Sequence, residues 1–146
     1  RDPRVAVPAA IGVLILLLTT AGLSARLLVE HDVRDARARV ASDPATAIRR
    51  ADDALALDAD ALPAYHAKAA AIARYGDAAP AIAVLREALR RQPDDFVTWA
   101  LLGDLQTRSG DRAAARRSYA RALRLNPRDA TLREALRSAS RAPTRS

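Results

Sequence analysis

Histidine and aspartate are the residue types in this sequence that could act in catalysis or bind a metal ion. The two histidines, His31 and His66, lie 35 residues apart, which is not the short spacing of a metal-binding motif. Aspartates are adjacent at 52–53 and 94–95, so on a helix the two carboxylates of each pair would point in different directions. No serine stands in a G-x-S-x-G context, and no glycine-rich phosphate loop is present. We therefore expect no enzymatic activity within this chain, no metal site and no cofactor.

Three other aspartates recur at a fixed interval, because Asp43, Asp77 and Asp111 are 34 residues apart. Alanine and leucine residues recur in the same register. A period of this length is typical of repeat arrays, in which each unit stacks on its neighbours. The Gly-Asp pairs at 76–77 and 110–111 combine a glycine that ends one helix with an aspartate that caps the next. The sequence therefore predicts paired helices, and helix capping explains the aspartates without a metal ion.

The clearest unit, Phe96–Asp129, resembles the tetratricopeptide repeat, with Gln106 as its one departure among eight signature positions. The seven matching positions are Trp99, Leu102, Gly103, Ala115, Tyr119, Ala122 and Pro127. The unit Leu62–Asp95 keeps the same register except at Lys68, and before it only a second half, Asp43–Asp60, is recognisable. The resemblance covers residues 43–129 and implies an all-α solenoid of one half-repeat and two full repeats.

The chain after Asp129 is expected to form a capping helix, because its apolar residues follow a helical spacing with charged residues on the other faces. These apolar residues are Leu132, Ala135, Leu136 and Ala139. We divide the chain into an anchor at 1–25, a linking helix at 26–42, a solenoid with its capping helix at 43–141 and a disordered tail at 142–146. The linking helix is a degenerate first half-repeat.

The segment Val5–Ala25 carries no charge over 21 residues and is bracketed by Arg4 and Arg26. As a helix it would span about 31 Å, close to the hydrocarbon thickness of a bilayer. We therefore expect a single transmembrane helix that precedes the array. A cleaved signal peptide is the alternative, but the apolar stretch exceeds the usual length of about 7–15 residues, and residues 23–25 form a poor cleavage site.

Beyond the apolar segment, Val29, Val33, Ala36 and Val40 form one stripe, so we expect the anchor helix to continue into the first helix that packs against the array. The arginine count on the two sides favours a cytoplasmic array, whereas a resemblance to anchored bacterial repeat proteins favours an extracytoplasmic one. We adopt the extracytoplasmic orientation in a bacterial inner or plasma membrane. Because the sequence opens on arginine and contains no methionine, we expect it to be a fragment.

The positive charge is concentrated at the C-terminal end of the sequence. Residues 105–146 hold 11 arginines and three acidic residues, for a net charge of +8, whereas residues 1–104 have a net charge of −1. This region is either a contact for an anionic surface or the solvated face of an arginine-rich protein. Nucleic acid is disfavoured as a partner because aromatic residues for base stacking are nearly absent there. The absence of cysteine excludes disulfides and thiol catalysis.

In tetratricopeptide arrays the first helix of each unit lines a concave face that takes up a partner's extended peptide or helix. The resemblance assigns nine residues to this groove: His66, Ala70, Ala73, Arg74, Val97, Ala100, Asp104, Thr107 and Arg108. The lysine and asparagine clamp by which some relatives hold acidic chaperone tails is absent, with His66, Ala70, Ala100 and Asp104 at its positions.

The sequence thus favours a membrane-tethered scaffold that binds a protein partner through its groove. Two alternatives stay open. The chain resembles the C-terminal repeat tail of a larger polytopic glycopolymer ligase or polymerase of the O-antigen ligase type, with the catalytic part upstream. The other alternative is an accessory factor of the cytochrome-assembly or pilus-assembly type, which would also be an anchored binding module.

Overall fold

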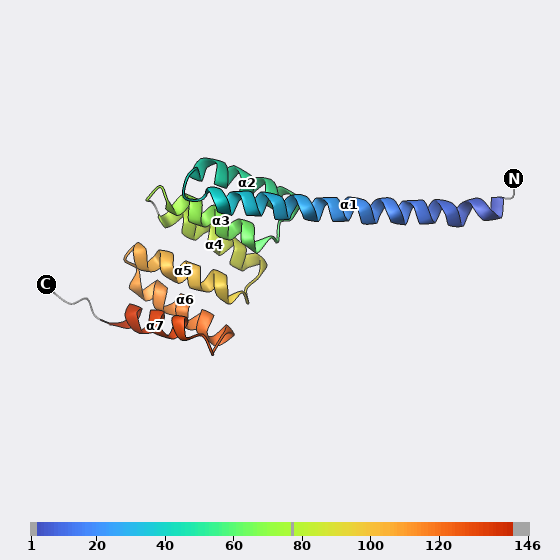
Figure 1. The fold of residues 1–146 in the computed structure, drawn as a ribbon. Helices are drawn as coiled ribbons and strands as arrows, with labels where there is room; N and C mark the ends of the chain where they lie inside the picture. Colours follow the sequence, from blue (N-terminus) through green and yellow to red (C-terminus); the bar gives the residue numbers. More distant parts are fainter. Residues whose placement is uncertain (1–2, 77, 142–146) are drawn as a thin grey trace.

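The computed structural model describes the backbone of residues 3–76 and 78–141 and the side chains of residues 19, 21–76 and 78–141. Within these residues the chain forms helices and no strand, which confirms the predicted all-α class. The helices are α1 (Pro3–Arg39), α2 (Pro44–Leu57), α3 (Leu62–Ala73), α4 (Ala78–Arg91), α5 (Phe96–Arg108), α6 (Arg112–Leu125) and α7 (Ala130–Ser140), shown in Figure 1. The predicted disordered tail at 142–146 lies outside the described residues.

The helices repeat at the interval that the sequence predicts. Helices α2, α4 and α6 begin at residues 44, 78 and 112, and α3, α5 and α7 begin at residues 62, 96 and 130, so each series advances by 34 residues. Each helix packs against the next one along the chain, and α1 also contacts α3 (Figure 1). The C-terminal part of α1 thus takes the place of the first helix of a unit, and α7 closes the other end of the stack.

Aspartates cap the helices as the sequence predicts. The carboxylates of four of them accept a hydrogen bond from a backbone N–H in the first turn of α2, α5, α6 and α7: Asp43, Asp95, Asp111 and Asp129. Gly76 and Gly110 follow α3 and α5 with φ angles of 94° and 84°, in the left-handed region that side chains disfavour. The predicted cap at Asp77 lies outside the described residues.

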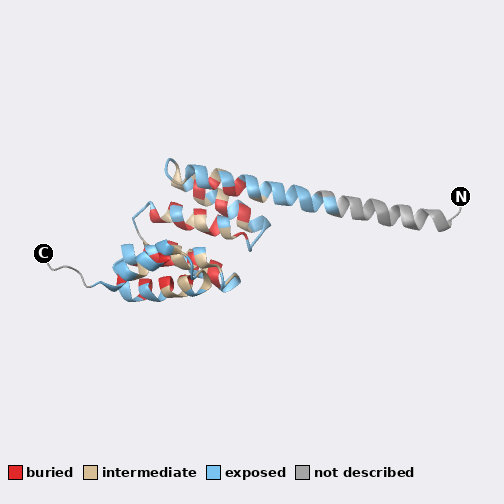
Figure 2. Cartoon of the chain, turned by 60° about the horizontal axis from the view of Figure 1, so that its bottom comes forward, coloured by how far each residue is buried: buried red, intermediate tan, exposed pale blue. Residues whose placement is uncertain are grey.

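Alanine forms most of the core between the helices. Alanines with no exposed surface occur on α1, α2, α3, α4 and α6: Ala36, Ala47, Ala51, Ala54, Ala64, Ala71, Ala81, Ala88, Ala115 and Ala122. Figure 2 shows the buried residues on the faces that the helices turn toward one another. Because a methyl side chain occupies little space, the helices approach closely, and a few larger side chains such as Leu85 fill the remaining volume.

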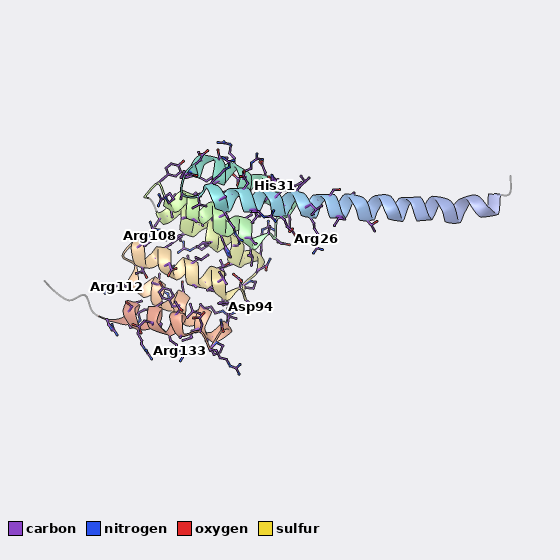
Figure 3. The ribbon with its side chains drawn as sticks, viewed as in Figure 1. Arg26, His31, Asp94, Arg108, Arg112 and Arg133 are labelled. Carbon is purple, nitrogen blue, oxygen red and sulfur yellow. The ribbon has the colours of Figure 1, made fainter. Side chains whose placement is uncertain are left out.

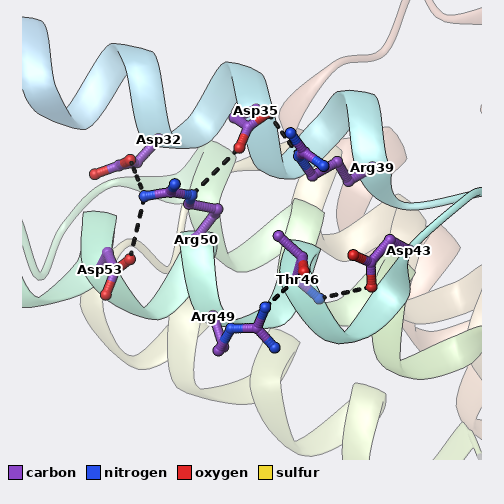
Figure 4. Close-up of polar contacts among 8 residues, drawn as sticks. All are labelled: Asp32, Asp35, Arg39, Asp43, Thr46, Arg49, Arg50 and Asp53. Carbon is purple, nitrogen blue, oxygen red and sulfur yellow. Dashed lines mark hydrogen bonds and ion pairs between the residues drawn. The ribbon is translucent and has the colours of Figure 1, made fainter.

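An arginine on α2 joins the first two helices, as Figure 4 shows. Arg50 Nε lies 3.2 Å from Asp35 Oδ2, and its Nη1 lies 3.5 Å from Asp32 Oδ1 and 3.7 Å from Asp53 Oδ2. Asp32 is buried, with 8% of its surface exposed, so Arg50 supplies the positive charge that its carboxylate needs. A hydrogen bond from Arg39 Nε lowers the pKa of Asp35, so the Asp35 carboxylate that pairs with Arg50 stays ionised.

The stripe predicted beyond residue 26 faces the array. Val33 and Ala36 are buried against α2 and α3, and Val29 packs against the same cluster. Helix α1 is continuous from Pro3 to Arg39, so the apolar segment and the first packed helix share one backbone helix.

Most of the predicted anchor, Val5–Ala25, lies outside the residues whose side chains the structure describes. Its backbone belongs to α1. Among the described residues, none of the helices combines the length and the hydropathy that a membrane crossing requires. Membrane insertion of this segment stays a prediction.

Candidate partner-binding groove

A groove of about 280 Å³ lies between α3, α5 and the residue that follows α1. Its lining comprises Val40, His66, Ala69, Ala70, Ala73, Arg74, Leu85, Leu101, Asp104, Leu105 and Arg108. Helix α3 contacts α5 directly, because both are the first helices of adjacent units. The groove therefore follows from the stacking of equivalent helices, whose curved array leaves one face concave.

The floor of the groove is apolar. Ala69, Ala73 and Leu105 are buried there, and Leu85 reaches the same floor from α4. Ala70 on α3 remains exposed at the surface of the groove. A small side chain at this position keeps the groove open, so a partner's apolar group could reach the floor without displacing a large residue.

Two arginines give one end of the groove a positive charge. Arg74 caps the C-terminus of α3, and Arg108 is the last residue of α5. Figure 3 shows Arg108 on the side of the array that faces away from the N-terminal part of α1. Arg108 Nη2 donates a hydrogen bond to the backbone oxygen of Ala73 at 3.3 Å. Neither guanidinium pairs with a carboxylate in the described part of the chain, so both are available to an acidic group of a partner.

One carboxylate, that of Asp104, also lines the groove. The Tyr119 hydroxyl donates a hydrogen bond to Asp104 Oδ1 at 2.7 Å. Burial of the phenol is the main cause that raises the pKa of Tyr119 to about 12; the contact with Thr107 opposes this shift, and the Asp104 carboxylate adds to it. Tyr119 therefore keeps its proton at neutral pH and orients the Asp104 carboxylate at the groove.

His66 connects the two units that form the groove. Its Nε2 lies 2.7 Å from Thr98 Oγ1, and the Thr98 hydroxyl donates to Asp95 Oδ2 at 2.6 Å. Since the single hydroxyl proton is given to Asp95, we infer that Nε2 of His66 carries a proton and donates to the hydroxyl oxygen. Burial lowers the pKa of His66, although the charge of Asp95 opposes this shift, so the ring is neutral at pH 7.

Threonine, histidine and aspartate also occur together in catalytic triads, but the arrangement of Thr98, His66 and Asp95 does not support catalysis. Thr98 has no exposed surface, so no substrate could reach its hydroxyl. Its proton goes to the carboxylate and not to the imidazole, whereas an activated nucleophile gives its proton to the base. The contact is thus structural and fixes α5 against α3. Across the described residues, histidines and acidic side chains form no cluster suited to a metal ion.

The groove includes six of the nine residues that the resemblance assigned to it: His66, Ala70, Ala73, Arg74, Asp104 and Arg108. Partner binding by these residues stays a prediction. The other three, Val97, Ala100 and Thr107, do not line the groove. Ala100 packs against the cluster that α6 and α7 form, and the Thr107 hydroxyl donates to the Gly103 backbone oxygen at 2.9 Å. Ala100 and Thr107 thus lie on the part of α5 that is turned toward α6, whereas Val97 is exposed.

Five lining residues were not assigned from the sequence: Val40, Ala69, Leu85, Leu101 and Leu105. Leu101 and Leu105 are one helical turn apart, next to Asp104 and Arg108 on the surface of α5. This spacing was visible in the sequence and could have placed them on the groove side. Val40 was also detectable, because it ends the apolar stripe of the first helix.

Comparison with known proteins agrees with this geometry. The sequence profile of the tetratricopeptide repeat matches residues 97–129. No curated protein gives a significant sequence match. The profile match shows that the chain contains a tetratricopeptide repeat, and solved structures extend the similarity of fold to the rest of the array.

Three of these structures are similar to this chain at low sequence identity. The crystal structure of MamA superimposes with a TM-score of 0.67 at 19% identity, over 76% of this chain and 66% of that one. The first tetratricopeptide domain of human RPAP3 gives 0.68 at 19% identity, over 80% and 89%. The second domain of human RPAP3, in complex with the HSP70 peptide SGPTIEEVD, gives 0.71 at 14% identity, over 81% and 99%. The described helices thus form a solenoid of the tetratricopeptide repeat type.

Proposed function

We propose that this chain is a membrane-tethered scaffold that binds a protein partner through the groove between α3 and α5. The observation that carries the proposal is the combination of an apolar floor with two arginines at one end, Arg74 and Arg108, that pair with no carboxylate of the described residues. A peptide with a small apolar side chain and a nearby carboxylate would satisfy both features. The RPAP3 domain that is similar in fold was solved with an acidic peptide, which supports a peptide as the ligand class.

A substitution that fills the groove without disturbing the core tests this function. Ala70 lines the groove and is exposed, so Ala70→Trp should block the floor while the array stays folded. Ala83 is exposed on α4 and lines none of the described cavities, so Ala83→Trp is the matched control. A partner identified by co-purification with the wild-type chain should be lost with Ala70→Trp and retained with Ala83→Trp. Retention by both variants, or loss from both, would refute binding in the groove.

Membrane tethering is proposed from the uncharged segment Val5–Ala25, whose backbone continues without interruption into the array as α1. We propose that the array lies on the extracytoplasmic side of a bacterial inner or plasma membrane. The full chain should remain in the membrane pellet after alkaline carbonate extraction, whereas a chain that starts at Arg26 should be soluble. Release of the full chain by carbonate would refute the tether, and protease digestion of intact spheroplasts would test the orientation.

The continuous helix α1 also favours a second candidate, the repeat tail of a polytopic glycopolymer ligase of the O-antigen ligase type. In that case α1 would be the last membrane span of a longer protein. The upstream part of the open reading frame decides between the two, because several further apolar spans are required by the second candidate only.

A further inference from the structure

A second and larger trough, of about 800 Å³, lies between α4 and α6. Its walls are the second helices of adjacent units, and α5 supplies its floor through Trp99, Leu102 and Gln106. The groove between α3 and α5 is lined by Leu101, Asp104 and other residues on a different face of α5. The two cavities have no lining residue in common.

The walls of the trough carry a concentrated positive charge. Arg86 and Arg90 line it from α4, and Arg117, Arg121 and Arg124 line it from α6. On each helix these positions are three or four residues apart, so they lie on one face. The two sets of guanidinium groups therefore lie along opposite walls of one depression.

Two of the five arginines are paired with carboxylates of the protein itself. Arg121 Nη2 pairs with Asp94 Oδ1 at 2.7 Å, and Arg90 pairs with Glu87 on its own helix. The only acidic lining residue is Asp111, whose carboxylate already accepts the Ala114 backbone N–H at the start of α6. The remaining three arginines, Arg86, Arg117 and Arg124, are exposed and form no ion pair with any described residue.

We propose that this trough binds an acidic segment of a protein partner, separately from the groove between α3 and α5. Arginines on both walls can hold carboxylates that lie between them, since guanidinium and carboxylate form paired hydrogen bonds. The floor contains Leu89 and Leu102, so it can also cover an apolar side chain of the same segment. Charge and shape together thus match a peptide with acidic residues around an apolar one.

Other polyanions match the trough less well. Lipid headgroups form a broad surface, whereas these arginines line the walls of a depression. Single-stranded nucleic acid needs aromatic faces for its bases, and Trp99 is the only aromatic residue of the lining. The indole of Trp99 is half-buried and donates its N–H to the Pro93 backbone oxygen at 2.8 Å.

Fluorescence anisotropy with the full chain in a non-ionic detergent tests the proposal. The probe is a labelled peptide of glutamate and leucine residues, compared with a peptide in which glutamine replaces every glutamate. The test variant combines Arg86→Gln, Arg117→Gln and Arg124→Gln. The matched control combines Arg34→Gln, Arg116→Gln and Arg128→Gln, three exposed arginines outside the trough, so that both variants lose the same charge.

We expect the acidic peptide to bind and the glutamine peptide not to bind. The trough variant should weaken binding about tenfold or more, as expected from the loss of three exposed ion pairs, and the control variant about twofold or less. Equal losses in the two variants, or no binding by the wild-type chain, would overturn the proposal. Circular dichroism of both variants should match the wild type, because the substituted side chains are exposed.

Two further arms separate the alternatives. Binding to oligothymidylate, and the preference for anionic over neutral vesicles, should be the same for the trough variant and the control variant. If the trough variant loses either of these but still binds the peptide, the trough is assigned to that polyanion and the proposal fails. Ala70→Trp should leave peptide affinity unchanged. A loss with Ala70→Trp that the trough variant does not share would place the peptide in the groove of the proposed function and refute a second site.

Discussion

The substitution Gly103→Ala tests how closely α5 and α6 pack. A Cβ atom on Gly103 would lie 2.6 Å from Cε1 and 2.8 Å from Cδ1 of the Tyr119 ring. Carbon atoms in contact are normally about 3.5–4.0 Å apart, so the ring would have to move by about 1 Å. Tyr119 is only 4% exposed and its hydroxyl is held by Asp104, so it cannot swing into solvent.

Three effects determine how much Gly103→Ala changes the free energy of unfolding. Overpacking of a buried site costs about 1–3 kcal/mol. Alanine in place of glycine within a helix contributes about 1 kcal/mol in the opposite direction. Displacement of the ring also weakens the hydrogen bond from Tyr119 to the Asp104 carboxylate, a class of bond that contributes about 1.5–3 kcal/mol. We therefore expect the free energy of unfolding to fall by about 2 kcal/mol.

Urea denaturation followed by tryptophan fluorescence measures this change, because Trp99 is the single tryptophan and lies one helical turn from Gly103 on α5. With a urea dependence of about 1–3 kcal/mol/M, the midpoint should fall by about 1 M. Gly22→Ala is the matched control, since a Cβ at Gly22 on α1 would meet nothing within 4 Å.

A double-mutant cycle identifies the cause. If the Tyr119 ring is responsible, Gly103→Ala should cost much less in a Tyr119→Leu background than in the wild type. An unchanged or higher midpoint for Gly103→Ala alone would refute the argument that this glycine is required by close packing. An equal cost in both backgrounds would show that the ring is not the obstacle.

Three further substitutions test the polar contacts between helices. The pKa of His66 is lowered in the folded chain, so the unfolded chain binds a proton more readily, and the free energy of unfolding should fall as the pH drops below 6.5. His66→Gln should remove this pH dependence between about pH 7 and pH 5, as measured by urea titrations. Arg50→Met should lower the free energy of unfolding by about 1–2 kcal/mol, because buried Asp32 loses its counter-charge. Ser118→Ala should cost about 1–3 kcal/mol in thermal or urea unfolding, since buried Gln106 Oε1 loses its donor at 2.7 Å.

Each of these three predictions has a control within the same protein. The carboxylates with lowered pKa values, Asp35 and Asp43, lose stabilisation only below their ordinary value of 3.8, outside the range in which His66 titrates. Arg49→Met and Ser138→Ala remove similar side chains at exposed positions, so their effects should stay within about 0.5 kcal/mol. A pH dependence that survives His66→Gln, or control variants as unstable as the test variants, would contradict the assigned roles.

The repeat and its helix boundaries were predictable because they depend on local sequence. Glycine after a helix and aspartate before the next act within a few residues, and the 34-residue period places each such pair. The groove was predictable only in part. The sequence indicates which face of α5 a residue occupies, but not how far a neighbouring helix covers that face. Ala100 illustrates this, because it packs against the cluster of α6 and α7 and does not line the groove.

The polar contacts between helices were not predicted, because they join residues that are distant in the sequence. His66 and Thr98 are 32 residues apart, and Arg50 reaches Asp32 across 18 residues. Neither pair follows a local spacing rule, and each residue type is common on solvated helix faces. The arginine trough has the same origin, since the arginines of α4 and α6 come together only when the two helices stack on α5.

These polar contacts matter more in this array than in one with a leucine core. Contacts between methyl groups are weak and nearly alike, so alanine faces allow close approach but distinguish poorly between one helix register and the next. A buried polar pair tolerates only one register, because a shift leaves a donor or acceptor without a partner. Polar pairs with at least one buried partner stand at three interfaces of the array: Arg50 with Asp32, His66 with Thr98, and Ser118 with Gln106. We therefore infer that alanine sets the spacing of the helices and that these pairs set their register, and with it the shape of both cavities.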